Sequence, residues 1–347
     1  MKPKQQEFAA PKRPTRYANL ALQGGGAHGA FTWGVLDRLL EEPSLAIDGI
    51  SATSAGAVNA VVLAHGLTVG GREGAKNALF DFWRRMAEMA TTSFLQPSWY
   101  DRLTRSHSLE HSPGYFLFDL LSRVLSPYQF NPLNYNPLRS VLAEVVDFDR
   151  LRRECAVKLF CCATNVRTGK ARVFTNSEIS VASVLASACL PNFYQAVEID
   201  GEHYWDGGYI GNPALFPLIY NCEARDIIIV HVNPTERPDV PMTAPEILSR
   251  INEISFNSSL LREMRAIAFV TNLIDDKSVA NHKRMLIHAI DADDVMRGLK
   301  VNSKLNTDWK FLTYLHGIGR DRADLWLRSH LDMLGVESTV DIRTKYL

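Results

Sequence analysis

The stretch that decides the fold reads YANLALQGGGAHG and occupies residues 17–29. Its first six residues form a short apolar run that suits a buried β-strand, and its glycines form a turn. Apolar side chains follow at helical spacing in residues 30–42. Residues 47–52 then predict a second short strand, and residues 57–65 predict a helix of small residues. Strands that alternate with helices are typical of an α/β fold whose mainly parallel sheet is flanked by helices.

The same alternation continues outward from this stretch. Further strands are expected at residues 157–165, 171–175, 196–200, 201–205 and 226–232. Further helices are expected at residues 75–89, 180–189, 244–275 and 321–335, and a glycine-rich loop is expected at residues 66–74. The strands at 196–205 meet at Asp200-Gly201, a dipeptide that favours a hairpin turn.

Composition divides the chain into three parts, the second of which contains an insertion. Residues 1–16 are polar and rich in Pro and Lys, and predict a flexible tail. Residues 17–235 predict the main α/β domain, within which residues 91–137 are rich in aromatic residues and prolines and predict a cap or insertion. Residues 236–347 predict a helical region that packs on this domain or extends it.

The overall composition excludes several classes of protein. Lys plus Arg and Asp plus Glu each number 38, so the formal net charge is zero. Nucleic-acid-binding proteins usually have a basic excess, so no nucleic-acid partner is expected. No stretch approaches the ~20 apolar residues of a membrane span, and the N-terminus lacks the apolar core of a signal peptide. The five cysteines follow no CxxC spacing, so we expect buried free thiols and a cytoplasmic location.

The glycine turn is a candidate anion site. Glycine lets the backbone approach a ligand closely, and N–H groups at a helix N-terminus attract negative charge. Gly24, Gly25, Gly26 and Ala27 can therefore form a cradle for an anion or an oxyanion. A purely structural turn is the plain alternative.

The same turn also matches the dinucleotide fingerprint G-x-G-x-x-G through Gly24, Gly26 and Gly29. That fingerprint requires an acidic residue at the far end of the second strand. The nearest candidate, Asp48, lies near the start of its strand, where contact with a ribose is awkward. A dinucleotide-binding oxidoreductase stays open as a second hypothesis, which a thermal shift with NAD(P) would test.

The second turn, ATSAG at residues 52–56, has the shape of the G-x-S-x-G nucleophile elbow. Ser54 is the candidate nucleophile, and the small residues Ala52 and Gly56 prevent clashes in a sharp turn. Ala52 replaces the usual first glycine, so the match is incomplete. The alternative is that Ser54 only caps the following helix.

A serine hydroxyl is a weak nucleophile without a base. Asp206 is the candidate base, because it follows a predicted strand and Gly207 and Gly208 let it project from a tight turn. An ordinary Asp-Gly turn is the alternative. The later histidines lie in no motif that suggests a catalytic triad: His203, His231, His282, His288, His316 and His330.

Taken together, these motifs resemble those of the patatin-like phospholipases. That family combines a G-G-G-x-[KR]-G oxyanion loop, a G-x-S-x-G elbow and a later D-G-[GA], which stand here at residues 24–29, 52–56 and 206–208. Two supporting stretches also match, SACLP at 187–191 and GNP at 211–213. The resemblance covers about residues 18–235.

The resemblance implies a three-layer patatin-like fold and a Ser-Asp dyad that cleaves lipid esters. Ser54 would attack the acyl carbonyl, Asp206 would take the proton, and the glycine loop would hold the oxyanion. Water would then hydrolyse the acyl-enzyme, with no metal and no organic cofactor. His28 stands where the family usually has Lys or Arg, so charge at that position would depend on pH.

The expected partner is a lipid or another acyl ester, and a peripheral membrane contact stays open. The aromatic insertion at residues 91–137 could line an acyl groove, touch a lipid surface or form a packed cap. The helix at residues 75–89 has an apolar face that fits a core better than an interface. A non-catalytic lipid-binding protein on the same fold is the third hypothesis.

Overall fold

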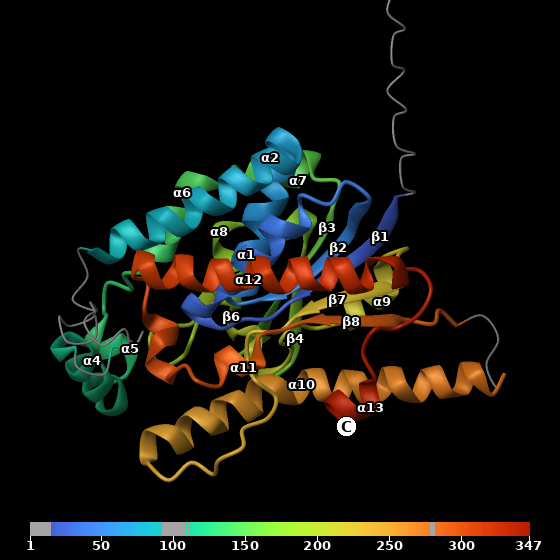
Figure 1. Cartoon of the computed structure of the whole chain (residues 1–347). Helices are drawn as coiled ribbons and strands as arrows, with labels where there is room; N and C mark the ends of the chain where they lie inside the picture. Colours follow the sequence, from blue (N-terminus) through green and yellow to red (C-terminus); the bar gives the residue numbers. More distant parts are fainter. Residues whose placement is uncertain (1–14, 92–108, 110–111, 278–281) are drawn as a thin grey trace, which may run out of the picture.

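The sheet is the frame of the molecule. The structure, a computed structural model, describes residues 15–91, 109, 112–277 and 282–347. Within these residues it has an eight-stranded sheet in the order β5-β6-β3-β2-β1-β7-β8, with β4 paired to β3 (Figure 1). Its strands are β1 (Arg16–Leu22), β2 (Leu45–Thr53), β3 (Lys158–Asn165), β4 (Ala171–Thr175), β5 (Val197–Ile199), β6 (Glu202–Asp206), β7 (Asp226–Val230) and β8 (Leu286–Ile290).

The sheet is mixed but mostly parallel, as the sequence predicted. Strands β3, β2, β1, β7 and β8 run parallel to one another. β4 and β6 pair antiparallel with β3, and β5 pairs antiparallel with β6. The β5–β6 hairpin turns at Asp200 and Gly201, whose φ angles are both positive, as a two-residue turn of this kind requires.

Helices cover both faces of the sheet, so the fold has three layers (Figure 1). The α-helices are α1 (Gly29–Leu39), α2 (Ala55–Thr91), α4 (Pro113–Val124), α5 (Pro127–Phe130), α6 (Pro137–Val145), α7 (Phe148–Glu154), α8 (Val181–Ser187), α9 (Phe216–Asn221), α10 (Ala244–Asp275), α11 (Asp293–Met296), α12 (Trp309–His330) and α13 (Ile342–Tyr346). Short 3₁₀ turns complete the chain: η1 (Gly26–His28), η2 (Asn176–Glu178), η3 (Gly207–Tyr209), η4 (Val301–Leu305) and η5 (Leu331–Met333).

Strand β7 shows how the two faces are filled. Its residues alternate, so Ile228 and Val230 join a core with α1, α2 and α12, while Ile227 and Ile229 join a second core with α9, α10 and α13. Successive side chains of a strand point to opposite faces of the sheet. A strand buried on both sides therefore reads as the continuous apolar run seen in the sequence.

Three expectations were wrong in detail. Residues 66–74 are not a loop, because α2 continues through them with a kink confined to Gly70 and Gly71. The last long helix, α12, begins at Trp309 rather than at residue 321. Strand β8 was not predicted, so the region after residue 235 is not purely helical.

Other expectations fall partly outside the described residues. The tail at residues 1–14 and most of residues 92–111 are not described, and Arg16 already belongs to β1. The described part of the aromatic insertion contains α4 and α5. All five cysteines are free, and four of them are buried. Among the described residues, no helix is long and apolar enough to span a membrane.

Candidate active site

The three sequence motifs meet at one end of the sheet. The glycine turn follows β1 and the serine turn follows β2, and these two strands are parallel neighbours with Leu22 opposite Ala52. Strand β3 neighbours β2 on the side away from β1, and β6 pairs with β3. Asp206 is the last residue of β6 and lies opposite Ala163 of β3. The carboxyl edge of a parallel sheet is where such turns gather in α/β proteins.

Ser54 stands on a strained turn. Its φ of 56° is positive, a backbone conformation that residues with a Cβ rarely adopt. The side chain of Ser187 holds the turn, accepting a hydrogen bond from the Ser54 N–H at 3.0 Å and donating to the carbonyl of Cys162 at 2.6 Å. A Cβ on Gly56 would lie 2.3 Å from the carbonyl oxygen of Leu22, so only glycine fits there.

This geometry argues against a purely capping serine. A capping residue usually has extended backbone angles, and its side chain accepts a hydrogen bond from the first helical turn. Ser54 has neither feature among the described contacts, although α2 begins at the next residue. Ala52, in place of the usual glycine, is buried in β2 opposite Leu22 and Cys161 and causes no visible distortion of the turn.

Asp206 is held rigidly in a buried position. Its backbone N–H donates to Cys189 and its carbonyl accepts from Thr164. Oδ1 of its carboxylate accepts a hydrogen bond of 2.7 Å from the Gly208 N–H. A Cβ on Gly207 would lie 2.1 Å from the carbonyl oxygen of Cys162, which explains the first glycine of the motif.

The other carboxylate oxygen, Oδ2 of Asp206, has no hydrogen-bond partner within the described residues. Burial raises the pKa of Asp206 to about 6, although the neighbouring Ser54 hydroxyl and the Gly208 N–H both lower it. Ser54 and Asp206 thus face each other, but they do not form a hydrogen bond of regular length and angle. Such contacts often tighten only when substrate is bound.

The glycine turn lies directly against Ser54. A Cβ on Gly24 would be 2.4 Å from the Cβ of Ser54, so this position must be glycine. The N–H of Gly24 donates to the side chain of Asn212 at 2.7 Å, so it is not free to bind an oxyanion. The amides of Gly25, Gly26 and Ala27 make no hydrogen bond within the described part of the chain.

Several buried amide side chains hold this turn in place. Gln23 accepts from the backbone N–H of Val232 and Asn233 and donates to Asn257. Asn233 donates to the carbonyl of Gly24 at 2.7 Å. Sequence reasoning missed Gln23, Asn233 and Asn257 as supporting residues. The only signal for Gln23 and Asn233 was their position directly after predicted strands, and Asn257, inside the helix predicted at residues 244–275, had none. Asn212 and Ser187 lay in the supporting stretches already noted.

His28 does not replace the charge of a Lys or Arg. The ring is buried, and its Nε2 lies 2.7 Å from the hydroxyl of Ser303. Burial, together with the nearby cations Lys304 and Arg237, lowers the pKa of His28 to about 3. His28 is therefore neutral throughout the physiological pH range.

Two alternatives from the sequence find no support in these contacts. Asp48 lies toward the amino end of β2 and accepts hydrogen bonds from the N–H groups of Glu223 and Ala224, away from the glycine turn. Among the described residues, no histidine forms a hydrogen bond with Ser54 or Asp206. His231, for example, is paired with Tyr346 in the core.

The chain matches one family model and several solved structures. The sequence model of the patatin-like phospholipases matches residues 20–219. VipD from Legionella pneumophila is similar in structure, with a TM-score of 0.44, 15% identity, and coverage of 91% of this chain and 67% of VipD. The type III effector ExoU gives a TM-score of 0.36 and 16% identity, with coverage of 93% of this chain and 54% of ExoU.

ExoU from Pseudomonas aeruginosa in complex with SpcU is a further structural match, at a TM-score of 0.32 and 14% identity, covering 91% of this chain. The chain spans about half the length of both ExoU chains. No curated protein matches the sequence. Because the family model matches more than half of its residues, the chain belongs to the patatin-like phospholipases, a family of carboxylic ester hydrolases that act on lipids.

Proposed function

We propose that the protein hydrolyses acyl esters of lipids through an acyl-enzyme, with Ser54 as nucleophile and Asp206 as general base. The observation that carries the proposal is that the buried carboxylate of Asp206 lies beside the Ser54 hydroxyl, while its Oδ2 has no hydrogen-bond partner among the described residues. A buried carboxylate with a free oxygen is costly to maintain. A proton-accepting role explains why the fold keeps it.

In the first half-reaction, Oγ of Ser54 attacks the acyl carbon while Asp206 takes the hydroxyl proton. The carbonyl oxygen becomes an oxyanion, for which the N–H groups of Gly25, Gly26 and Ala27 are the proposed donors. Removing one such donor typically slows catalysis by about 10²- to 10³-fold. The tetrahedral intermediate then collapses, the ester oxygen leaves, and the proton on Asp206 moves to the departing alcohol.

In the second half-reaction, Asp206 takes a proton from water, which attacks the acyl group on Ser54. Collapse of this second intermediate releases the fatty acid and returns the proton to Ser54. A general base works best when its pKa is close to the working pH. A pKa of about 6 is closer to pH 7 than the pKa of an ordinary aspartate, and it still leaves Asp206 mostly ionised at pH 7.

The direct test is the Ser54→Ala variant, assayed on a chromogenic acyl ester and on phospholipid vesicles with products identified by mass. We expect loss of turnover on both substrates and loss of labelling by a fluorophosphonate probe. Ser329→Ala is the matched control, because that hydroxyl lies on the exposed side of α12. A Ser54→Ala protein that turns over the ester at the wild-type rate contradicts the proposal, and a wild type that the probe does not label favours a non-catalytic lipid-binding protein.

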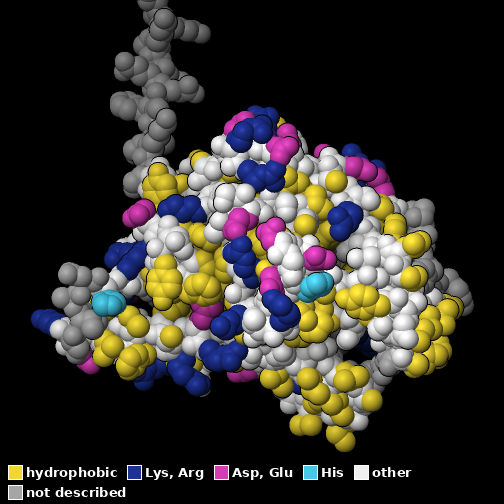
Figure 2. All heavy atoms as spheres, turned by 180° about the vertical axis from the view of Figure 1, so that it is seen from behind, with side chains coloured by type: hydrophobic (Ala, Val, Ile, Leu, Met, Phe, Trp, Pro, Cys, Tyr) yellow, Lys and Arg dark blue, Asp and Glu magenta, His cyan; other side chains and the backbone are white. Residues whose placement is uncertain are grey.

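We also propose that the protein contacts a lipid surface. The N-terminal half of α10 and helix α4 lie at the same end of the molecule, away from the start of β1 (Figure 1). Apolar side chains gather on the surface there (Figure 2). Among the described side chains, the exposed apolar residues of α4 and of the N-terminal half of α10 are Phe116, Leu117, Leu120, Val124, Ile247, Leu248, Ile251 and Ile254. Exposed apolar patches of this kind mark interaction sites.

Vesicle binding tests this surface separately from the chemistry. In the double variant Ile251→Asp, Ile254→Asp, we expect weaker sedimentation with phosphatidylcholine vesicles but unchanged hydrolysis of a water-soluble ester. Leu325→Asp, at an exposed position on α12, is the matched control. Equal vesicle binding by the double variant and the control excludes the α10 surface as the contact.

A further inference from the structure

A segment from the C-terminal part of the chain supports the glycine turn. Turn η4 packs against it so closely that a Cβ on Gly26 would lie 2.4 Å from the carbonyl oxygen of Lys304. Ser303 donates its hydroxyl proton to the carbonyl of Lys300 at 2.5 Å. Because a hydroxyl has one proton, Ser303 must accept from His28 Nε2–H, which fixes the neutral tautomer of the ring.

Lys304 reaches the turn through one intermediary. Its ammonium donates to Oδ1 of Asn233 at 2.8 Å, and Nδ2 of the same amide donates to the carbonyl of Gly24 at 2.7 Å. That carbonyl belongs to the planar peptide unit that carries the N–H of Gly25. Fixing the carbonyl of Gly24 therefore fixes the direction of the Gly25 N–H, which is a proposed oxyanion donor.

The chain of hydrogen bonds also transmits charge. Hydrogen bonds in series polarise one another, and a charged donor strengthens the effect. An ammonium on Oδ1 of Asn233 makes the Nδ2–H of that amide a better donor to the Gly24 carbonyl. The stronger hydrogen bond on that carbonyl in turn makes the Gly25 N–H of the same peptide unit a better donor. The arrangement aligns Lys304, Asn233 and the Gly24–Gly25 peptide in a single relay.

The charges around Lys304 leave a positive excess behind the turn. Its anionic neighbour Glu253 is buried and already paired with two arginines, Arg237 at 2.7 Å and Arg250 at 3.4 Å. Burial lowers the pKa of Lys304, Glu253 raises it and Arg237 lowers it further. With His28 neutral, Lys304 is the cation that the hydrogen bonds connect to the glycine turn.

We propose that Lys304 is a positioning residue for catalysis, orienting and polarising the Gly25 N–H through Asn233 and supplying the positive charge that the turn itself lacks. This inference rests on the proposed function of the Ser54 site. It assigns a role in the reaction to a residue 250 positions away from the nucleophile in sequence, in a region that the family match does not reach.

The test uses the full chain and p-nitrophenyl butyrate, a small neutral ester that offers no head group to bind. For Lys304→Met, we expect kcat to fall by about 10- to 100-fold, the range that a small misplacement of catalytic groups produces, with KM changed less than about threefold. Lys310→Met is the matched control, because that side chain is exposed at the start of α12.

A double-mutant cycle distinguishes an effect of Lys304 that passes through Asn233 from an independent effect of Lys304 on the stability of the site. If Lys304 acts through Asn233, Asn233→Ala lowers kcat as well, and the double variant loses no more than the worse single variant. Three outcomes overturn the proposal: losses of kcat that add in the double variant, a rise in KM in place of a fall in kcat, and unfolding of the Lys304→Met or Asn233→Ala variant. Circular dichroism melts of every variant establish the folded state.

The two proposals fail differently. An active Ser54→Ala variant removes the proposed function, whatever Lys304 does. An inactive Ser54→Ala variant together with a Lys304→Met variant that matches the Lys310→Met control removes only the role of Lys304.

Discussion

Ser54 holds a positive φ of 56°, and Asp206 holds a carboxylate from which water is excluded. Both conditions cost stability. A non-glycine residue in a sparsely populated backbone region costs on the order of 1–3 kcal/mol. The raised pKa of Asp206 records a second cost, because it shows that the folded protein disfavours the charged form.

The pKa of Asp206 makes the second cost measurable. The folded-state pKa of about 6 lies above the ordinary value of 3.8, so the folded protein binds more protons between these two pH values. The contribution of the protonated carboxyl to the free energy of unfolding is therefore at its full value below about pH 4, and it is lost as the pH rises through 6. A shift of roughly two units corresponds to about 3 kcal/mol.

We therefore expect Asp206→Asn to be inactive yet more stable than wild type at pH 7, by up to about 3 kcal/mol in the free energy of unfolding. The difference should shrink toward zero near pH 4, where the wild-type carboxyl is protonated. Urea denaturation at the two pH values measures it, with Ser329→Ala as a control that shifts neither curve. A variant whose stability relative to wild type does not depend on pH contradicts the assignment of the raised pKa to Asp206.

At this scale the sequence singled out side chains that the structure places together, Ser54 and Asp206, but it did not predict their surroundings. Ser54 and Asp206 stand in local motifs, and a motif is readable wherever its residues are contiguous. The occupied N–H of Gly24 was not predictable, because its acceptor Asn212 lies 188 residues away. The neutrality of His28 was hidden for the same reason, since its cause is burial beneath η4.

Among the elements, α1 and α12 pack with their backbones in direct contact. A Cβ on Gly34 would lie 2.0 Å from the carbonyl oxygen of His316, and a Cβ on Gly319 would lie 2.1 Å from the carbonyl oxygen of Phe31. The two glycines let the backbones touch. Sequence reasoning placed the start of α12 twelve residues too late because Gly317 and Gly319 weaken the helical signal, whereas tertiary packing is what favours glycine at position 319.

The two glycines of α12 allow a matched prediction. Gly319→Ala should destabilise the protein, because its new methyl group would meet the backbone of α1, and overpacking of this kind typically costs about 1–3 kcal/mol. Gly317→Ala should stabilise it by about 0.5–1 kcal/mol, because nothing lies within 4 Å of its Cβ and alanine is the better helix former. Thermal melts of both variants measure the contrast. Equal melting temperatures would mean that α12 does not pack on α1 in this way.

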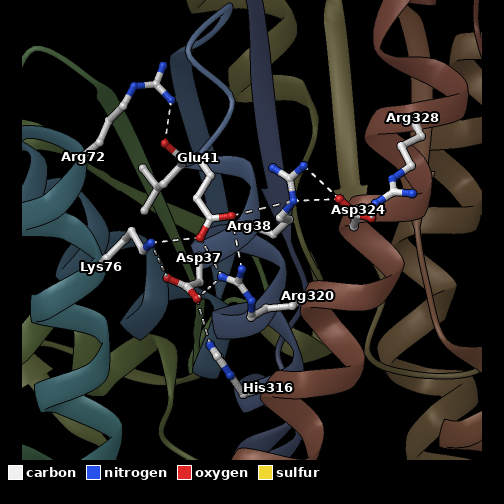
Figure 3. Close-up of polar contacts among 10 residues, drawn as sticks. Asp37, Arg38, Glu41, Arg72, Lys76, His316, Arg320, Asp324 and Arg328 are labelled. Carbon is white, nitrogen blue, oxygen red and sulfur yellow. Dashed lines mark hydrogen bonds and ion pairs between the residues drawn. The ribbon is translucent and has the colours of Figure 1, made fainter.

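Ion pairs reinforce the same pair of helices (Figure 3). Asp37 of α1 accepts hydrogen bonds from His316, at 3.2 Å, and from Arg320. Burial raises the pKa of Asp37, but the hydrogen bonds from His316 and Arg320 outweigh it, so the net pKa is lowered. The stabilisation by Asp37 is therefore present above its unfolded pKa and is lost as the pH falls below it.

Replacing this carboxylate should weaken the contact between the helices. We expect Asp37→Asn to lower the free energy of unfolding by about 1.5–3 kcal/mol at pH 7, the range for hydrogen bonds to a charged group, and by less near pH 3. Asp332→Asn, which removes an exposed pair with Arg16, is the control and should cost under about 1 kcal/mol. If both variants melt at the same temperature, the network in Figure 3 contributes no more than a surface pair.

For the whole molecule, the family match ends at residue 219, but the architecture does not. Strand β8 extends the sheet beside β7, α12 covers α1, and η4 packs against the glycine turn. The apolar run of β7 was readable from the sequence, since a strand buried on both faces is uniformly hydrophobic. The apolar run of β8 was not readable, because His288 interrupts it. The buried ring of this histidine is hydrogen-bonded to both Asp226 and Thr339.

We therefore propose that residues 236–347 are an inseparable part of the catalytic domain rather than an appendage. A chain that ends at residue 235 lacks α12. The buried side chain of Trp33, which packs against Trp309 and His316 of α12, would then be exposed to water, and exposing a large apolar side chain costs about 1.5–3 kcal/mol. The losses from many such residues would exceed the 5–15 kcal/mol that stabilises a typical domain. We expect the shortened chain to show no cooperative thermal transition by circular dichroism, rapid proteolysis, and no labelling of Ser54 by a fluorophosphonate. A shortened chain that melts cooperatively and still reacts with the probe would make residues 17–235 an independent domain, and the support from η4 would then be dispensable.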